Sequence, residues 1–158
     1  VCGKASIEAV RIACNIPGAP DALRVTADVL SPLPGLLRER QDEFENTGGL
    51  HACAIFDLAA QLLLSREDVG RHNALDKLVG AALISGLLPL HKHMLLLSGR
   101  ASFELIQKAV MAGIKIVAAV GAPSSLAAEM AEEWGMTLIG FLRNERFNIY
   151  SGAERVVI

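Results

Sequence analysis

The chain has few cysteines, no excess of basic side chains and no long apolar run, and each shortage excludes a class of protein. Its three cysteines are an odd number and too few for a disulfide framework, which indicates a reducing compartment. A net charge of -2 and an isoelectric point near 6.1 argue against a broad surface for nucleic acid or anionic membranes. No apolar stretch reaches the ~18 residues that span a bilayer, and the start shows no signal-peptide pattern. We therefore expect a soluble cytoplasmic protein that binds neither nucleic acid nor membrane.

The common nucleotide and zinc motifs are also missing. The lack of a GxGxxG or Walker pattern argues against a dinucleotide-dependent dehydrogenase and an NTPase. His51 and Cys53 share one face of an expected strand and form a possible metal pair. The sequence contains no CxxC, nor the HxE and PCxxC motifs of a zinc deaminase, to supply further ligands. We therefore expect no protein-bound metal.

What remains is an apolar chain of ordinary domain size. Of its 158 residues, 52% are hydrophobic and 20% are charged, and the mean hydropathy is +0.39. This composition predicts one domain over residues 1–158 with a well-buried core. The apolar excess in so short a chain also favours a homodimer. Because the first residue is Val1 rather than Met, we expect further residues upstream.

Turn residues and apolar periodicity predict helices followed by a hairpin in the first part of the chain. Ser6–Ala13 is expected to begin a helix, with Ser6 as its cap. Pro32–Pro34 should break the chain before a charged helix over 36–45, which the following asparagine and glycines should end. Strand-like runs at 51–56 and 61–65, joined by a short connection, indicate a hairpin.

The second half of the chain alternates strands with helices, which is typical of a parallel sheet. After a helix over 71–86, strands are expected at 94–98, 115–120 and 137–142, and helices at 102–112 and 125–134. Right-handed crossovers pack helices against the sheet, and apolar strands with little alternation indicate that both faces are covered. With the hairpin, this predicts an α/β fold: a three-layer α/β/α sandwich with a mixed sheet.

A polar block, Arg66–Lys77, stands out between the apolar runs 62–64 and 78–84. It should contain the end of a strand and the first turn of a helix, with Asp68 as a possible cap. Its charges have two interpretations. In the structural one, they form a paired network that fixes the start of the helix. In the functional one, Arg71 and His72 form a cationic wall of the ligand pocket, and Asp68 and Asp76 orient them. We interpret the block as a mixture of both.

Three loops should meet beyond the carboxyl ends of the parallel strands, where open α/β sheets bind ligands. They are SGRAS at 98–102, GAPSS at 121–125 and RNER at 143–146. Helix amino termini and arginines both favour an anion such as phosphate. Taken singly, Ser102 and Ser125 are more often plain helix caps, Gly99 a turn residue, and Arg143 and Arg146 ordinary surface residues. The expected convergence of the loops favours a phosphate-bearing ligand.

Five segments in order resemble the FdhD/NarQ family of formate dehydrogenase accessory sulfurtransferases. They are VCGKASIEAV at the start, TGGLHACAIF at 47–56, REDVGRHNALDKLVGAAL at 66–83, LLLSGRASFELIQKAVMAGI at 95–114 and GFLRNERFNIYSG at 140–152. The resemblance implies a carrier that takes persulfide sulfur from a cysteine desulfurase. It delivers the sulfur to the molybdenum or tungsten bis-pterin guanine dinucleotide cofactor of formate dehydrogenase. It also implies a cytidine-deaminase-like core that lacks the zinc motif.

The resemblance also implies site residues. The family pattern C-G-x-C-G makes Cys2 its second cysteine and the candidate catalytic residue here, and we expect the first, principal cysteine before Val1. Cys14 and Cys53 are interpreted as inert. The guanine dinucleotide site maps onto Phe141, Leu142, Arg143, Asn144, Glu145 and Arg146, and its other walls onto Ser98, Gly99, Arg100, Ser102, Arg71 and His72. Phe141 is expected to line the pocket or stack, the two arginines to meet phosphate, and Glu145 to accept from a guanine edge.

The leading hypothesis is therefore a sulfurtransferase whose chemistry depends on a cysteine rather than on His72. The alternative is a chaperone that binds the molybdenum cofactor and its client enzyme but transfers no sulfur. A deaminase-like hydrolase is disfavoured because the residues that would activate water are missing.

Overall fold

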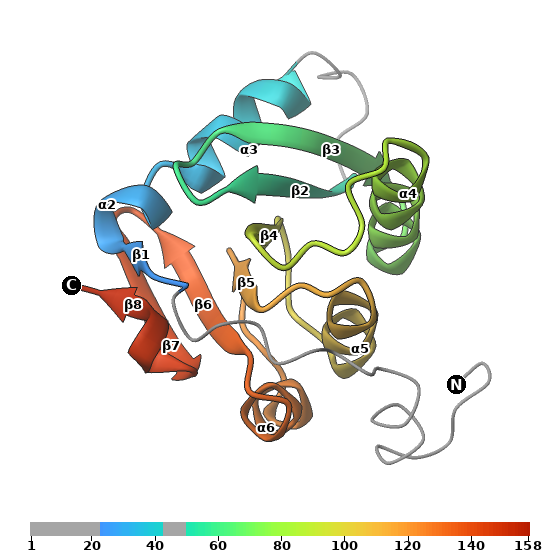
Figure 1. Cartoon of the computed structure of the whole chain (residues 1–158). Helices are drawn as coiled ribbons and strands as arrows, with labels where there is room; N and C mark the ends of the chain where they lie inside the picture. Colours follow the sequence, from blue (N-terminus) through green and yellow to red (C-terminus); the bar gives the residue numbers. More distant parts are fainter. Residues whose placement is uncertain (1–22, 43–49) are drawn as a thin grey trace.

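The computed structural model describes residues 23–42 and 50–158, which form a three-layer α/β/α sandwich around a mixed six-stranded sheet (Figure 1). The strands are β2 (His51–Asp57), β3 (Leu62–Asp68), β4 (His93–Leu97), β5 (Ile116–Ala119), β6 (Thr137–Arg143) and β7 (Arg146–Ser151), in the order β3-β2-β4-β5-β6-β7. Strands β4, β5 and β6 are parallel, and an antiparallel hairpin flanks them on each side. The predicted fold class is confirmed.

Helices cover both faces of the sheet and define two apolar cores. One layer contains α4 (Arg71–Ile84), α5 (Phe103–Met111) and α6 (Ser125–Glu133), and the other contains α2 (Ala27–Leu30) and α3 (Leu33–Asp42). Alternate strand residues enter the two cores, so Leu95 packs toward α4 and α5 while Leu96 packs toward α2 and α3. The apolar strands lack polar alternation because neither face of the sheet is open to water.

The first part of the chain differs from the prediction in two respects. The helix α3 begins at Leu33 and includes Pro34 in its first turn, where the missing amide of proline breaks no helical hydrogen bond. A short helix, α2, precedes it, and the Thr26 hydroxyl caps α2 by accepting from the Val29 amide at 3.4 Å. The predicted helix at Ser6–Ala13 and the end of the charged helix lie outside the described residues.

The end of the chain contains elements that were not predicted. The expected loop at 143–146 is a hairpin turn that leads into β7, and its central residues Asn144 and Glu145 have φ of 52° and 60°. A 3-10 helix, η1 (Ala153–Arg155), then leads to β8 (Val156–Val157), which pairs in parallel with β1 (Val25–Thr26). The buried Arg155 donates to the Thr137 hydroxyl at 3.1 Å and attaches this segment to β6. No helix in the described part of the chain is long and apolar enough to cross a membrane.

Candidate functional site

Two of the three predicted loops, 98–102 and 121–125, are in contact beyond the carboxyl ends of the parallel strands. The Gly121 amide donates to the Gly99 carbonyl at 3.0 Å, and the Phe141 amide of β6 donates to the Gly121 carbonyl at 3.1 Å. A Cβ atom on Gly121 would lie 2.9 Å from the Gly99 carbonyl oxygen, so only glycine fits at this crossing. The predicted convergence is confirmed for these two loops, while the residues 143–146 form the tip of the β6–β7 hairpin, two residues beyond Phe141.

Ser98 and Gly99 shape this edge mainly through their backbone and local contacts. The Ser98 hydroxyl accepts from the Ala52 amide at 2.9 Å, and the Ser98 amide donates to the Ala52 carbonyl at 2.9 Å. These bonds extend the pairing of β2 with β4. The His51 ring lies beside Gly99, with Nδ1 3.4 Å from the position that a Cβ atom would take. The Ser98 hydroxyl is therefore already used within the protein.

The predicted cap of α4 is wrong. Gly70 is the N-cap residue, and Asp68 instead accepts from the Gly70 amide at 2.9 Å just before the helix. Asp68 also pairs with Lys77, with 2.5 Å between carboxylate oxygen and ammonium nitrogen. The Lys77 hydrogen bond, supported by the Gly70 amide, lowers the pKa of Asp68 to about 2. This part of the polar block is a charge-paired network that fixes the helix start.

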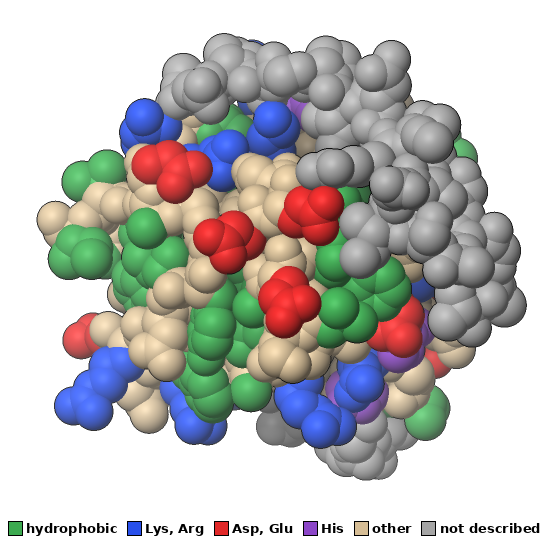
Figure 2. Space-filling view, turned by 90° about the horizontal axis from the view of Figure 1, so that it is seen from below, with side chains coloured by type: hydrophobic (Ala, Val, Ile, Leu, Met, Phe, Trp, Pro, Cys, Tyr) green, Lys and Arg blue, Asp and Glu red, His purple; other side chains and the backbone are tan. Residues whose placement is uncertain are grey.

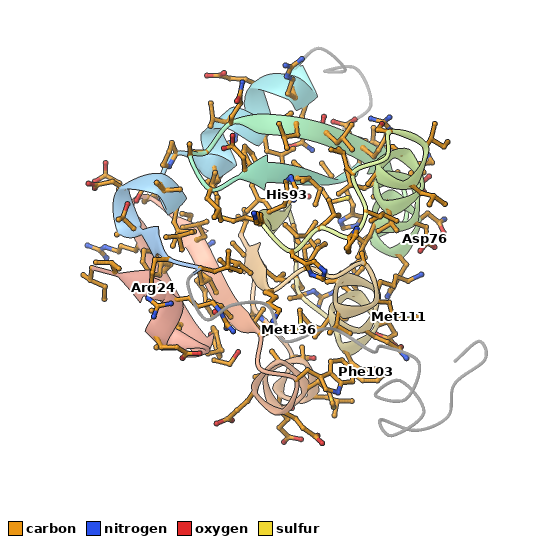
Figure 3. The ribbon with its side chains drawn as sticks, viewed as in Figure 1. Arg24, Asp76, His93, Phe103, Met111 and Met136 are labelled. Carbon is orange, nitrogen blue, oxygen red and sulfur yellow. The ribbon has the colours of Figure 1, made fainter. Side chains whose placement is uncertain are left out.

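Asp68 and Asp76 do not orient Arg71 and His72 as predicted. Asp76 projects from α4 away from the sheet (Figure 3) and pairs with Lys108 of α5 at 2.5 Å, while Asp68 pairs with Lys77. Each carboxylate therefore forms an ion pair with a lysine on the outer surface of the helix layer. The aspartates stabilise α4 and its contact with α5 instead of building a binding wall.

His72 lies between the starts of α4 and α5. Its Nε2 atom is 3.5 Å from the Ser102 hydroxyl and 3.8 Å from the Glu104 carboxylate. The Ser102 side chain makes no capping bond to α5, although Ser102 is the N-cap residue. Nearby, the Nε atom of Arg71 is buried and has no hydrogen-bond partner among the described residues. The first turn of α5 already contains the Glu104 carboxylate, which accepts from its own backbone amide and whose pKa is lowered by that bond, whereas the first turn of α4 has neither a side-chain cap nor an acidic residue. The start of α4 therefore keeps amide groups that an anion can approach.

A hollow of about 660 Å³ lies on the β6–β7 hairpin, and we call it the hairpin pocket. Its lining combines two guanidinium groups, two aromatic rings and two side-chain amides: Phe141, Arg143, Asn144, Arg146, Phe147 and Asn148. Of the predicted residues, Leu142 is fully buried in the core on the α2 and α3 side of the sheet, and Glu145 is exposed but does not line the hollow. Phe147 and Asn148 were missed, although Arg146, Asn148 and Tyr150 alternate with apolar residues in the period of a strand.

An irregularity in β6 aims the side chains of this pocket. The pairing with β7 shifts register between Gly140 and Arg143, and Phe141 has φ of 53°, a left-handed conformation that is rare for a bulky residue. Phe141 thereby leaves the core alternation and stands half-exposed, with the Arg143 guanidinium 5.8 Å from its ring centre. Guanidinium groups bind phosphate and an aromatic ring stacks on a base, so the pocket suits a nucleotide.

Other faces of the molecule are less suited to an anion. Figure 2 views the molecule from the side of α6 and shows carboxylates in the middle of this face, with most of the basic side chains toward its rim. Glu129 and Glu132 of α6 are both exposed. Like charges repel an anionic ligand from this helix.

The described cysteine is not a reactive thiol. Cys53 is buried in the core under α4, and desolvation raises its pKa to about 12 despite the opposing effect of Arg66. Within residues 23–42 and 50–158, no cluster of three or more His, Cys, Asp or Glu side chains could hold a metal ion. The candidate catalytic residue Cys2 lies outside the described residues.

A family model described as the FdhD/NarQ family matches residues 1–157. The chain belongs to the FdhD/NarQ family. Among its FdhD relatives, the sulfur carrier protein FdhD of Streptomyces coelicolor is 57% identical over the whole chain, and that of Mycobacterium tuberculosis is 50% identical over 99% of it. The chain spans 56% of the length of each of these relatives.

Solved structures agree with the FdhD/NarQ assignment. A putative formate dehydrogenase accessory protein from Desulfotalea psychrophila is 26% identical and superposes with a TM-score of 0.80, covering 93% of this chain and 62% of that one. A guanine deaminase from Nitrosomonas europaea is 12% identical, with a TM-score of 0.53 and coverage of 90% and 89%. The second likeness concerns the fold alone and confirms the predicted cytidine-deaminase-like core.

Proposed function

We propose that this chain is the nucleotide-binding part of a sulfur carrier. It would receive persulfide sulfur from a cysteine desulfurase and deliver it to a molybdenum bis-pterin guanine dinucleotide cofactor destined for formate dehydrogenase. The names of its curated relatives support sulfur carriage, and the name of the Desulfotalea protein supports a link to formate dehydrogenase. The cofactor is the cargo of the protein in this scheme.

The hairpin pocket is the observation that carries the proposal. Arg143 and Arg146 both line it, and neither has a carboxylate partner among the described residues. Two unneutralised guanidinium groups beside a half-exposed ring match the pyrophosphate and the base of a guanine dinucleotide. An ordinary surface hairpin has no need of this combination.

The starts of α4 and α5 supply a second anion-binding wall in this proposal. Strands β4 and β6 are separated only by β5, so they lie about 10 Å apart across the sheet at the usual strand spacing, and β6 extends three residues beyond the level at which β4 ends. Arg71, His72, Arg100 and Ser102 at the helix starts would contact the remoter part of a long cofactor, next to the turn at Gly99. Ser98 would support that wall through its bond to Ala52.

The sulfur step belongs to the amino-terminal cysteine pair in this proposal, of which Cys2 is the second member. A thiolate of the pair would attack the terminal sulfur of the donor persulfide, the donor S–S bond would break, and the donor cysteine would leave as a thiolate. The pair would then carry the persulfide to the bound cofactor. A thiol relay of this kind requires a reducing compartment, which favours the cytoplasm.

Binding of guanosine diphosphate by calorimetry tests the pocket. Replacing both Arg143 and Arg146 with alanine should weaken binding by at least about 100-fold, because each charge-assisted contact contributes about 1.5–3 kcal/mol. The matched control replaces Arg38 and Arg40 with alanine. Both are exposed on α3, in the helix layer on the other face of the sheet from α4, α5 and α6. Equal affinity in the pocket variant and the control would contradict the assignment.

A second experiment separates the sulfur carrier from the chaperone. The full-length protein is incubated with a cysteine desulfurase and cysteine, and its amino-terminal cysteines are examined by mass spectrometry. A mass increase of one sulfur atom at this cysteine pair is expected for the carrier. If the protein binds guanosine diphosphate but never acquires sulfur, the chaperone function is favoured.

A further inference from the structure

Asn148 occupies an unusual position in the hairpin pocket. In β7 the exposed residues Arg146, Asn148 and Tyr150 alternate with Phe147 and Ile149. Asn148 pairs in register with Gly140 of β6, so no side chain faces it across the two strands. A Cβ atom at Gly140 would lie 2.5 Å from the Pro123 ring and 2.7 Å from the Tyr150 ring, which keeps this position free of a side chain. The Pro123 and Tyr150 rings occupy the space over Gly140, and Asn148 lines the hairpin pocket beside the two arginines.

The fold does not explain why this residue is an asparagine. Asparagine is depleted in strands, where its side chain neither packs nor favours the extended backbone. The other asparagine of the pocket, Asn144, has φ of 52° in the hairpin turn, a conformation that asparagine tolerates well. No hydrogen bond to the Asn148 side chain is present within the described part of the chain. Its amide group is thus free to bind a ligand.

We propose that Asn148 determines base specificity by reading the edge of a guanine base in the hairpin pocket. The inference rests on the proposed nucleotide-binding function of that pocket. A side-chain amide offers an acceptor and donors together, so Asn148 accepts from guanine N1–H and donates to O6. Glu145, the residue first expected to read the base, does not line the hollow and leaves this role to Asn148.

Three ligands separate base reading from phosphate binding in calorimetry: guanosine diphosphate (GDP), inosine diphosphate (IDP) and inorganic pyrophosphate. Asn148→Ala should weaken GDP binding about tenfold, the usual size of a bidentate base contact, and leave pyrophosphate binding unchanged. Inosine lacks only the guanine N2 amino group, so the native protein should bind GDP and IDP alike. Asn148→Asp offers acceptors only, which suit N1–H and N2–H₂, so the ratio of GDP to IDP affinity should rise at least about fivefold.

The control variant is Gln61→Ala. It removes an exposed side-chain amide just before β3, at the end of the sheet opposite the carboxyl ends of the parallel strands. An equal loss of GDP and pyrophosphate binding in Asn148→Ala, or an unchanged GDP to IDP ratio in Asn148→Asp, overturns the inference. If both Asn148 variants behave like the control while the native protein binds GDP, the inference fails and the proposed function stands. If the native protein binds neither GDP nor pyrophosphate, the proposed function fails and the inference fails with it.

Discussion

The hairpin pocket and the polar block Arg66–Lys77 lie at the same end of the sheet, beyond the carboxyl ends of β6 and β3, which are on opposite sides of it. They differ in how their charged side chains are paired. In the block, Asp68 pairs with Lys77, Asp76 pairs with Lys108, and His72 lies 3.8 Å from Glu104. In the hairpin pocket, Arg143 and Arg146 have no such partner among the described residues. The block is the denser polar segment of the sequence, and three of its six charged residues, Asp68, Asp76 and Lys77, are paired within the protein. Arg71, like the two arginines of the hairpin pocket, has no carboxylate partner among the described residues. Polar density alone is therefore a poor marker of a ligand site.

Local geometry explains this difference. Side chains on a helix have neighbours one turn away and on the next helix, so α4 finds counter-charges at short range. Arg143 and Arg146 face each other at the turn of a two-stranded hairpin, where both are exposed and neither has a carboxylate partner among the described residues. A charge at such a turn stays available to an external partner.

The largest expected effect comes from detaching the hairpin pocket from the core. Leu142 of β6 is fully buried in the core on the α2 and α3 side of the sheet, next to the register shift that accompanies the outward position of Phe141. Leu142→Ala should lower the free energy of unfolding by about 2–5 kcal/mol, because it leaves a cavity in a packed core. Chemical denaturation measures this. Alanine at the exposed Leu83 of α4 is the control, and equal losses in both variants would refute the anchoring role of Leu142.

A direct test of the comparison replaces one residue from each region, Arg143 and His72. Arg143→Ala should weaken GDP binding by about 10- to 100-fold, since it removes a charge-assisted contact to phosphate. His72→Ala should change the affinity by less than about threefold, because His72 already has Ser102 and Glu104 beside it. Calorimetry of both variants compares the regions directly. A larger effect at His72 would reverse the conclusion and make the helix starts the main binding surface.

The dependence of stability on pH tests whether Asp68 of the polar block stabilises the fold. Its pKa of about 2 lies below its ordinary value of 3.8, so Asp68 stabilises the fold above about pH 4. That contribution should disappear as the pH falls from about 4 to about 2. The melting temperature of Asp68→Asn should therefore depend less on pH in this interval than that of the native protein. Circular dichroism at several pH values measures the difference, and parallel curves would contradict the role of the Lys77 pair.

The smallest effect is expected at Cys53. Because burial raises its pKa to about 12, its thiol should resist iodoacetamide at pH 8 in the folded protein and react once the chain is unfolded. Peptide mass spectrometry identifies the labelled site. Cys53→Ala should also leave sulfur loading unchanged. Rapid labelling of Cys53 in the folded state would mean that the core under α4 opens readily.

Much of the fold could be predicted because its strands are apolar and its helices amphipathic. The runs at 51–56, 94–98 and 115–120 became β2, β4 and β5 within a residue or two, and the order of elements brought the loops 98–102 and 121–125 together. A charge-paired network around Asp68 was predicted, but its partner Lys77 was not, because the contact depends on how α4 packs beside the end of β3. The Asp76–Lys108 pair was missed because it depends on the packing of α4 against α5. Homodimer formation stays a prediction.

Strand β7 was missed because its turn carries none of the usual signals. The residues Asn144 and Glu145 both have positive φ, yet neither is a glycine, so RNER resembled a loop. The alternation of Arg146, Asn148 and Tyr150 was the available signal. The register shift at Phe141 had no signal at all, because it depends on the Gly121 carbonyl of a neighbouring strand end.

The left-handed backbone of Phe141 sets two selective pressures against each other at one position. Glycine would adopt this φ without the penalty of about 1–2 kcal/mol that a side chain incurs, so selection for stability alone would favour losing the ring. Selection for ligand binding would favour keeping it. A laboratory selection for thermal tolerance without its ligand should therefore enrich glycine at position 141, and the evolved proteins should lose nucleotide affinity as they gain stability.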